Sequence, residues 1–168
     1  MNKRAERSGE RGYFTVVLVT VLVFVLDFFS KLFVMRTMFV GQSIAVIPHV
    51  FYVTYVQNPG AAFGLLANQT LLFVVATLLA VLAVVLLTPR HSGLGMRWSL
   101  GMFLGGALGN LVDHLWLGSV VDFLDFRIWP VFNVADVALV LGVFSLALQL
   151  TALPGRRQEK QEKGSTSG

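Results

Sequence analysis

Apolar and polar positions divide the chain into four long apolar runs separated by more polar segments. The runs cover residues 13–34, 71–87, 98–117 and 131–153, and each is 17 to 23 residues long. About 20 helical residues cross a bilayer core of ~30 Å. The pattern therefore predicts an α-helical polytopic membrane protein with four transmembrane helices.

The composition supports one membrane-embedded domain. Of the 168 residues, 55% are hydrophobic and 13% are charged, whereas a soluble domain has about 25% charged residues. We assign residues 13–153 to a single four-span domain, between polar tails at residues 1–12 and 154–168. No polar segment has the ~50 residues of a second soluble domain.

The basic residues predict the orientation. Ten lie before the first run, between the second and third runs, or after the fourth: Lys3, Arg4, Arg7, Arg11, Arg90, Arg97, Arg156, Arg157, Lys160 and Lys163. The opposite side has Arg36 and Arg127, with Lys31 just inside the membrane. By the positive-inside rule both termini are cytoplasmic. This placement also argues against nucleic acid as a partner, despite a net charge of +4.

The two outward loops are unusually apolar. Residues 50–56 are β-branched or aromatic, as in strands, and Asn58-Pro59-Gly60 supplies a turn. We therefore expect a small extracytoplasmic β-sheet within residues 35–69. The second loop, residues 118–130, mixes apolar residues with Asp122 and Asp125, which predicts an interfacial loop or helix.

Polar side chains within the predicted spans gather at one depth. They form three pairs spaced three or four residues apart: Asp27 and Lys31, Asn110 and Asp113, and Asn133 and Asp136. All fall in the outer part of the bilayer, which predicts one polar cluster. Each pair can either join helices or contact substrate. For Gly101, Gly105 and Gly109 we expect close helix packing.

Several kinds of chemistry find little support. Cysteine is absent, and His49, His91 and His114 share no local metal-binding spacing, so we predict no metal and no cofactor. Ser30 adjoins Lys31, but neighbouring helix positions point apart, which disfavours a serine nucleophile.

Carboxylic acid chemistry remains. Two carboxylates close together at a low-dielectric boundary tend to share a proton, as in aspartic proteases. Asp136 is one candidate, and by spacing alone either Asp122 or Asp125 serves as the other. A proton-coupled transporter also uses intramembrane carboxylates, but the inner halves of these spans are almost purely apolar. A non-catalytic assembly protein would leave the gathering of carboxylates at one depth unexplained.

Five motifs make the interpretation specific. They are Asp27-Phe-Phe-Ser-Lys31, Asn58-Pro-Gly-Ala-Ala-Phe63, Gly105-Gly-Ala-Leu-Gly-Asn110-Leu-Val-Asp113, Val120-Val-Asp122-Phe123 and Phe132-Asn-Val-Ala-Asp136. In this order they closely resemble the bacterial lipoprotein signal peptidases, also called signal peptidase II, along nearly the whole chain between the tails.

The resemblance implies an aspartic endopeptidase of the bacterial cytoplasmic (inner) membrane. It implies cleavage of diacylglyceryl-modified prolipoproteins just before the lipidated cysteine, close to the outer face. Asp122 and Asp136 match the family's catalytic pair, which selects Asp122 over Asp125. Asn58, Gly106, Asn110 and Asn133 match its substrate pocket, and Asp27, Lys31 and Asp113 match its buried polar framework. Expected partners are the prolipoprotein and membrane lipid, with the enzyme a monomer.

Two positions depart from the family pattern. Phe28 follows Asp27 where the family usually has Gln, and His114 follows Asp113 where it usually has Arg. Because a histidine is shorter than an arginine and has an ordinary pKa near 6.5, any substrate contact at position 114 differs in kind from that of the family's Arg.

Overall fold

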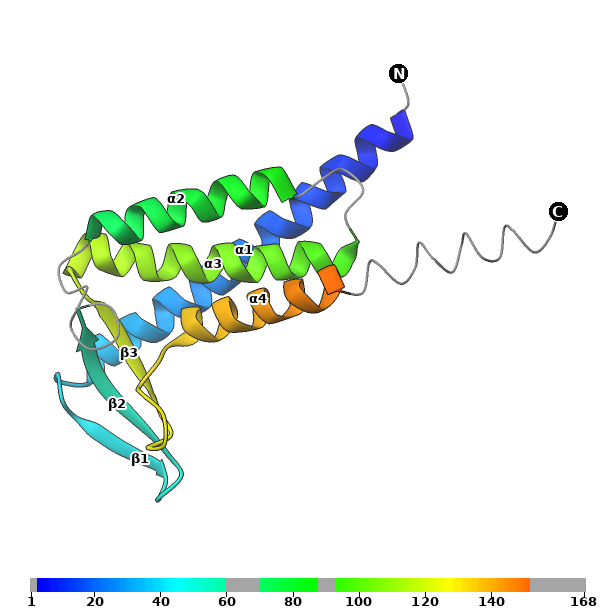
Figure 1. Ribbon diagram of the computed structural model, residues 1–168. Coiled ribbons are helices and arrows are strands. Elements are labelled where there is room, and N and C mark those ends of the chain that lie inside the picture. Colours follow the sequence, from blue (N-terminus) through cyan, green and yellow to red (C-terminus); the bar gives the residue numbers. More distant parts are fainter. Residues whose placement is uncertain (1–2, 60–69, 88–92, 152–168) are drawn as a thin grey trace.

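Four helices and a small sheet make up the computed structural model, which describes residues 3–59, 70–87 and 93–151. The elements are α1 (Lys3–Thr37), β1 (Ser43–Ile47), β2 (Phe51–Asn58), α2 (Thr70–Leu87), α3 (Leu94–Leu117), β3 (Val120–Asp125) and α4 (Val134–Thr151). Successive helices run in opposite directions, and the sheet covers one end of the bundle (Figure 1). The start of α1 and the end of α4 both lie at the other end (Figure 1).

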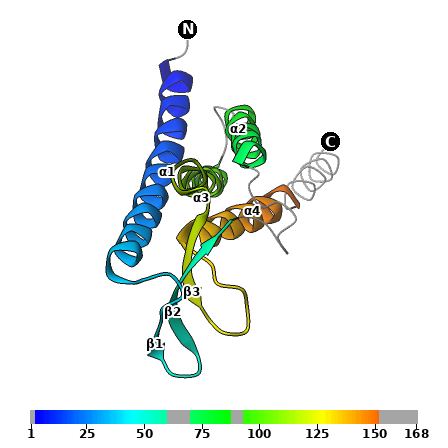
Figure 2. The ribbon, with the colours of Figure 1, turned by 90° about the vertical axis from the view of Figure 1, so that its left-hand side faces the viewer.

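Helix α3 is the centre of the bundle and packs against each of the other helices (Figure 2). A Cβ added at Gly101 or Gly105 would lie 2.6 Å from Val19 Cβ or 2.7 Å from Val23 Cβ, respectively, so these glycines bring α3 against α1. Gly142 has the same role on α4, where its Cβ would lie 2.8 Å from Phe103 N. The close helix packing expected from the α3 glycines is confirmed.

The outer faces of the helices are apolar. Large side chains stay exposed along α1, α2 and α4, among them Phe14, Leu26, Leu79, Val140 and Phe144. Among the described residues, the segment Tyr13–Thr37 is long and apolar enough to cross a membrane, with mean hydropathy 2.4, and α4 contains a shorter apolar stretch, Val134–Gln149. Among the described residues, one helix is thus long and apolar enough to span a membrane, and the presence of four spans stays a prediction.

The sheet has three antiparallel strands in the order β1-β2-β3. The β1–β2 hairpin confirms the strands expected in the first outward loop. The second loop differs from prediction, because residues 120–125 form β3 rather than an interfacial loop or helix. Strand β3 hydrogen-bonds along β2, a partner far away in the sequence. Gly60 of the predicted turn lies outside the described residues.

A small hydrophobic core fixes the sheet to the bundle. Val34 from α1, Tyr55 from β2, and Val121 and Phe123 from β3 are buried together there. The core orients β3 across the ends of α1 and α3, directly beside the start of α4 (Figure 1).

Candidate active site

The predicted polar residues converge at the sheet end of the bundle, supplied by α1, α3, β2, β3 and α4. Three of them form a buried charge cluster. Lys31 Nζ lies 2.7 Å from Asp27 Oδ2 and 2.9 Å from Asp113 Oδ2, and it donates a 3.0 Å hydrogen bond to Asn110 Oδ1. Two carboxylate oxygens and one amide oxygen thus surround the ammonium group. Because Lys31 is only 1% exposed, this pairing is what makes its burial tolerable.

The two carboxylates of this cluster also hold backbone. Asp27 Oδ1 accepts a 2.8 Å hydrogen bond from Ala135 N in the first turn of α4. Asp113 Oδ2 accepts a 3.0 Å bond from Val121 N on β3. The cluster thus fixes both β3 and the start of α4 to helices α1 and α3.

The first turn of α4 is closed by a reciprocal cap between Asn133 and Asp136. Asp136 N donates to Asn133 Oδ1 at 2.9 Å, and Asn133 N donates to Asp136 Oδ2 at 3.2 Å. The pattern follows the capping box, in which residues three apart satisfy each other's free N–H groups. It holds the Asp136 side chain at the beginning of the helix, facing back toward the sheet.

Asn133 joins the two candidate catalytic aspartates. Its Nδ2 donates to Asp122 Oδ1 at 2.7 Å, while its backbone N bonds to Asp136. Asp122 Oδ2 accepts a second bond from Asn58 Nδ2 at 3.0 Å, and Asp136 Oδ1 accepts one from Asn110 Nδ2 at 2.8 Å. Three asparagines therefore orient the two carboxylates within one hydrogen-bond network.

Asp122 and Asp125 have different environments, although both are on β3. Burial is the main cause that raises the pKa of Asp122 to about 6; the hydrogen bonds from Asn58 and Asn133 oppose the rise, and the nearby Asp136 adds to it. The hydrogen bond from Thr54 holds the pKa of Asp125 below its usual range. A carboxyl group with a raised pKa suits shared-proton chemistry better than one with a lowered pKa, and the choice of Asp122 over Asp125 stays a prediction.

The other predicted substrate residues have different surroundings. Gly106 packs against the α4 backbone at Ala135 O, and an added Cβ would also lie 2.9 Å from Leu139 Cγ. His114 is 3% exposed on α3 beside the charge cluster. Asn58 is solvent-exposed at the end of β2, with its amide on Asp122. Substrate contact by these residues remains a prediction.

Histidines and acids do not gather into a metal site in the part of the chain that the structure describes, which contains no cluster of three or more potential ligands. His49 lies in the turn between β1 and β2, far from His114 in sequence and element. His91 lies outside the described residues.

Two roles were not predicted from the sequence: the capping role of Asn133 and the hydrogen bond by which Thr54 holds Asp125. The first had a signal, because Asn133 and Asp136 are three apart at the start of an apolar run. The second had none, since Thr54 and Asp125 are 71 positions apart.

Comparison with known proteins extends this picture. The family model described as "Signal peptidase (SPase) II" matches residues 19–152. A lipoprotein signal peptidase of Pelotomaculum thermopropionicum is 46% identical over 154 residues, covering 89% of this chain and 98% of that protein. One from Moorella thermoacetica is 49% identical over 148 residues, covering 86% and 97%.

Two solved structures described as bacterial membrane enzymes share the fold. One has a TM-score of 0.77 at 34% identity and covers 82% of this chain and 88% of its own. The other has a TM-score of 0.75 at 34% identity and covers 81% and 92%. Fold and similarity together define a membrane enzyme. The chain belongs to the signal peptidase II family, and membership implies a peptidase, that is, a hydrolase.

Proposed function

We propose that this protein is an aspartic endopeptidase that removes signal peptides from diacylglyceryl-modified prolipoproteins, cutting just before the lipidated cysteine. The observation that carries the proposal is the bridging of Asp122 and Asp136 by Asn133, in a buried network beneath the sheet. The names of the relatives, lipoprotein signal peptidases, supply the substrate class.

The chemistry follows from two coupled carboxyl groups that share one proton. The ionised group takes a proton from a water molecule while the water oxygen attacks the peptide carbonyl carbon. The protonated group then supplies a proton to the leaving amine as the C–N bond breaks. Burial favours a protonated state for Asp122, and the two titrations belong to the pair rather than to either residue.

An apolar groove on α4 suits the membrane part of such a substrate. It is an open depression of about 460 Å³ on α4, the helix that carries Asp136 in its first turn, and its lining residues are Leu139, Val140, Val143, Phe144 and Ala147. A signal peptide contains an apolar helix, which can lie here with its scissile bond at the start of α4. The polar network would satisfy the peptide backbone where that helix unwinds.

We assign the protein to the bacterial cytoplasmic membrane as a monomer with four spans, both termini in the cytoplasm and the dyad near the outer face. The alternating helices support this topology, because they bring the start of α1 and the end of α4 to the end away from the sheet (Figure 1). Exposed aromatic residues support the boundaries: Tyr13 and Trp98 near that end and Trp116 near the sheet. Trp and Tyr are enriched at both membrane interfaces.

Substrate contacts are assigned to Asn58, Gly106, Asn110, Asn133 and His114. Asn110 and Asn133 adjoin the two carboxylates, so each could turn an amide toward the peptide when the substrate arrives. Gly106 keeps α4 close to α3, at the turn of α4 that carries Asp136. Asp27, Lys31 and Asp113 form the buried frame that holds these residues in position.

A gel-shift cleavage assay in detergent micelles tests the proposal. The purified protein receives a diacylglyceryl-modified prolipoprotein and, separately, the same precursor with the cysteine that carries the lipid replaced by serine. We expect cleavage of the lipidated precursor only, with mass spectrometry locating the new N-terminus at the modified cysteine. No cleavage by folded protein, or equal cleavage of both precursors, would contradict the assignment.

A further inference from the structure

Arg127 adopts a backbone conformation that is unusual for its residue type. It follows β3 with φ 65°, in the left-handed region that L-residues rarely enter. Such conformations persist only where the surroundings hold them, and they often mark functional segments. Arg127 lies between Asp122 and Asp136 in the sequence, in the loop that returns the chain from β3 to α4.

The Arg127 side chain takes part in a closed ring of hydrogen bonds across all three strands. Its Nη2 donates to Ser43 Oγ on β1 at 2.6 Å, and Ser43 Oγ lies 2.8 Å from Thr54 Oγ1 on β2. Thr54 donates in turn to Asp125 Oδ2 on β3 at 2.7 Å. Asp125 closes the ring by accepting the Arg127 backbone N–H at 2.8 Å, with Nε 3.4 Å from the carboxylate.

The donor order is fixed by these partners. Arg127 can only donate to Ser43, and Thr54 donates to the carboxylate, so the Ser43 hydroxyl donates to Thr54. We call these four residues, Ser43, Thr54, Asp125 and Arg127, the Arg127 ring. The guanidinium also stacks on one side against the Tyr52 ring, 3.7 Å from its centre, and the side chain stays 45% exposed.

The Arg127 ring lies beside an interruption in the backbone ladder. Between Val53 and Val56, β2 has one more residue than β3 opposite it, so the two strands lose regular pairing there. Asp122 pairs with Val56 just beyond that bulge. Side-chain bonds from Thr54 to Asp125 therefore take over where backbone bonds are missing, a few residues from the catalytic candidate.

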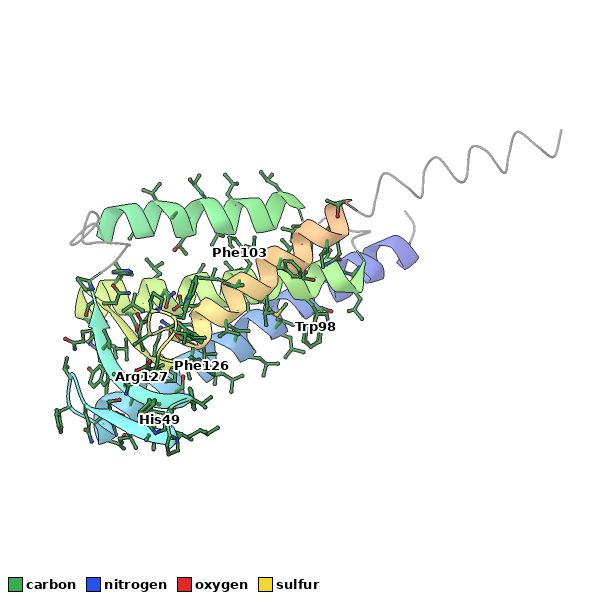
Figure 3. The ribbon with its side chains drawn as sticks, turned by 60° about the horizontal axis from the view of Figure 1, so that its bottom comes forward. His49, Trp98, Phe103, Phe126 and Arg127 are labelled. Atoms are coloured by element: carbon green, nitrogen blue, oxygen red, sulfur yellow. The ribbon has the colours of Figure 1, made fainter. Side chains whose placement is uncertain are left out.

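The loop after the ring is held at its base as well. Phe132 exchanges backbone hydrogen bonds with Leu124 at 2.7 and 3.1 Å, and Phe126 packs between Phe51 and Phe132 with centroids 4.9 and 5.9 Å apart. Phe126 and Arg127 lie at the sheet end of the molecule, near the hairpin that contains His49 (Figure 3). The loop leads directly into Asn133, which contacts both aspartates.

We propose that Arg127 is a positioning residue for cleavage: by closing this ring it fixes β3 against the bulged β2 and so sets the position of Asp122 relative to Asp136. The proposal rests on the proposed function for its reaction. It predicts that loss of the Arg127 side chain slows the chemical step rather than weakening substrate binding. The reason is that Arg127 contacts neither Asp122 nor Asp136 and lies outside the α4 groove.

Arg127→Gly is the sharpest test, because glycine adopts φ near 65° freely and the substitution removes the ring without adding backbone strain. We expect kcat to fall by about tenfold to a hundredfold with KM within about twofold. The kcat of Arg127→Lys should lie between those of wild type and Arg127→Gly, since Lys keeps the positive charge but lacks the planar guanidinium. Guanidinium ion added to Arg127→Gly should restore part of kcat, and Arg36→Gln, on the exposed last turn of α1, is the matched charge-loss control.

The contrary result is a kcat for folded Arg127→Gly within twofold of wild type, or a loss confined to KM. A second readout needs no cleavage. In a background with Trp98→Phe and Trp116→Phe, Trp129 reports on the loop, and its fluorescence anisotropy should fall in Arg127→Gly but not in Arg36→Gln. Unchanged anisotropy would overturn the proposal. Absence of cleavage by wild type and Arg36→Gln alike would instead count against the proposed function.

Discussion

Asp122 and Asp125 show how position along one strand separates two carboxylates chemically. Residues three apart on a strand point to opposite faces. Asp122 faces the polar network of asparagines beneath the sheet, whereas Asp125 joins Thr54 and Arg127 in the Arg127 ring. Burial is the main cause that raises the pKa of Asp122 to about 6, whereas the hydrogen bond from Thr54 lowers the pKa of Asp125.

The raised pKa of Asp122 predicts a pH-dependent loss of stability. A carboxyl group whose pKa is higher in the folded state binds its proton more tightly there, so stability falls as pH rises from the unfolded value toward and through the folded one. For a rise from 3.8 to about 6, the loss is about 3 kcal/mol. Relative to Asp122→Asn, the wild type should therefore lose stability between pH 4 and pH 7. Unfolding in micelles across that range measures the difference.

Asp125→Asn is the matched control for this titration. Because the pKa of Asp125 is lowered, its contribution is complete above its unfolded value and is lost only at lower pH. The stability difference between wild type and Asp125→Asn should thus stay constant from pH 5 to pH 8. If the stability difference from wild type changes with pH in the same way for Asp122→Asn and Asp125→Asn, the burial of Asp122 is not the cause of the stability loss between pH 4 and pH 7.

Helix α3 sets the spacing of the site through its glycines. Gly105 and Gly106 are adjacent and face different partners: Gly105 contacts Val23 on α1, and Gly106 contacts the α4 backbone near Ala135. Only residues without a Cβ at these two positions allow α1 and α4 to come this close to α3. The distance between α3 and the first turn of α4, which carries Asp136, depends on Gly106 in particular.

Gly106→Ala should therefore reduce both stability and activity. The added methyl would overlap Ala135 O, a backbone atom that cannot move without displacing α4. We expect a loss of about 1–3 kcal/mol in unfolding free energy, typical of overpacking, and a lower kcat because Asp136 shifts. Gly93→Ala is the control, since nothing lies within 4 Å of its added Cβ. Equal melting temperatures for the two variants would contradict this role of Gly106.

Elements with local signals could be predicted, and those built by distant contacts could not. The apolar runs gave the four helices to within a few residues at most ends, except that α1 continues back to Lys3. Residues 50–56 predicted a strand for the same reason, because their β-branched and aromatic composition is local. Strand β3 was missed because its pairing with β2 depends on a partner about sixty positions earlier, as the bond from Asn58 to Asp122 illustrates.

In the candidate site, too, contacts between residues close in sequence could be predicted and contacts between distant residues could not. The spacing of Asp27 and Lys31 predicted their ion pair, which is confirmed at 2.7 Å. Spacing alone left Asp122 and Asp125 equivalent, and family resemblance selected Asp122; that selection stays a prediction. No pattern could have predicted that Asp27 also binds Ala135 N, 108 positions away.

For the molecule as a whole, hydrogen bonds join the sheet and the bundle around Asp122 and Asp136. Asp27 on α1 holds α4, Asp113 on α3 holds β3, and Asn58 on β2 reaches Asp122. The two carboxylates thus depend on every layer of the fold. The apolar outer faces of the helices are consistent with a membrane enzyme, and the proposed lipid-anchored substrate would reach the site laterally through the bilayer.

The central claim is that Asp122 and Asp136 together perform the cleavage, and single-turnover rates of matched Asp→Asn variants test it most directly. With a diacylglyceryl-modified prolipoprotein in micelles, Asp122→Asn and Asp136→Asn should each lose about a thousandfold or more in rate, since either change removes half of a shared-proton pair. Asp125→Asn, on the same strand as Asp122, should keep measurable cleavage, reduced at most through the Arg127 ring. Cleavage by folded Asp122→Asn or Asp136→Asn at a rate close to that of wild type would contradict the account.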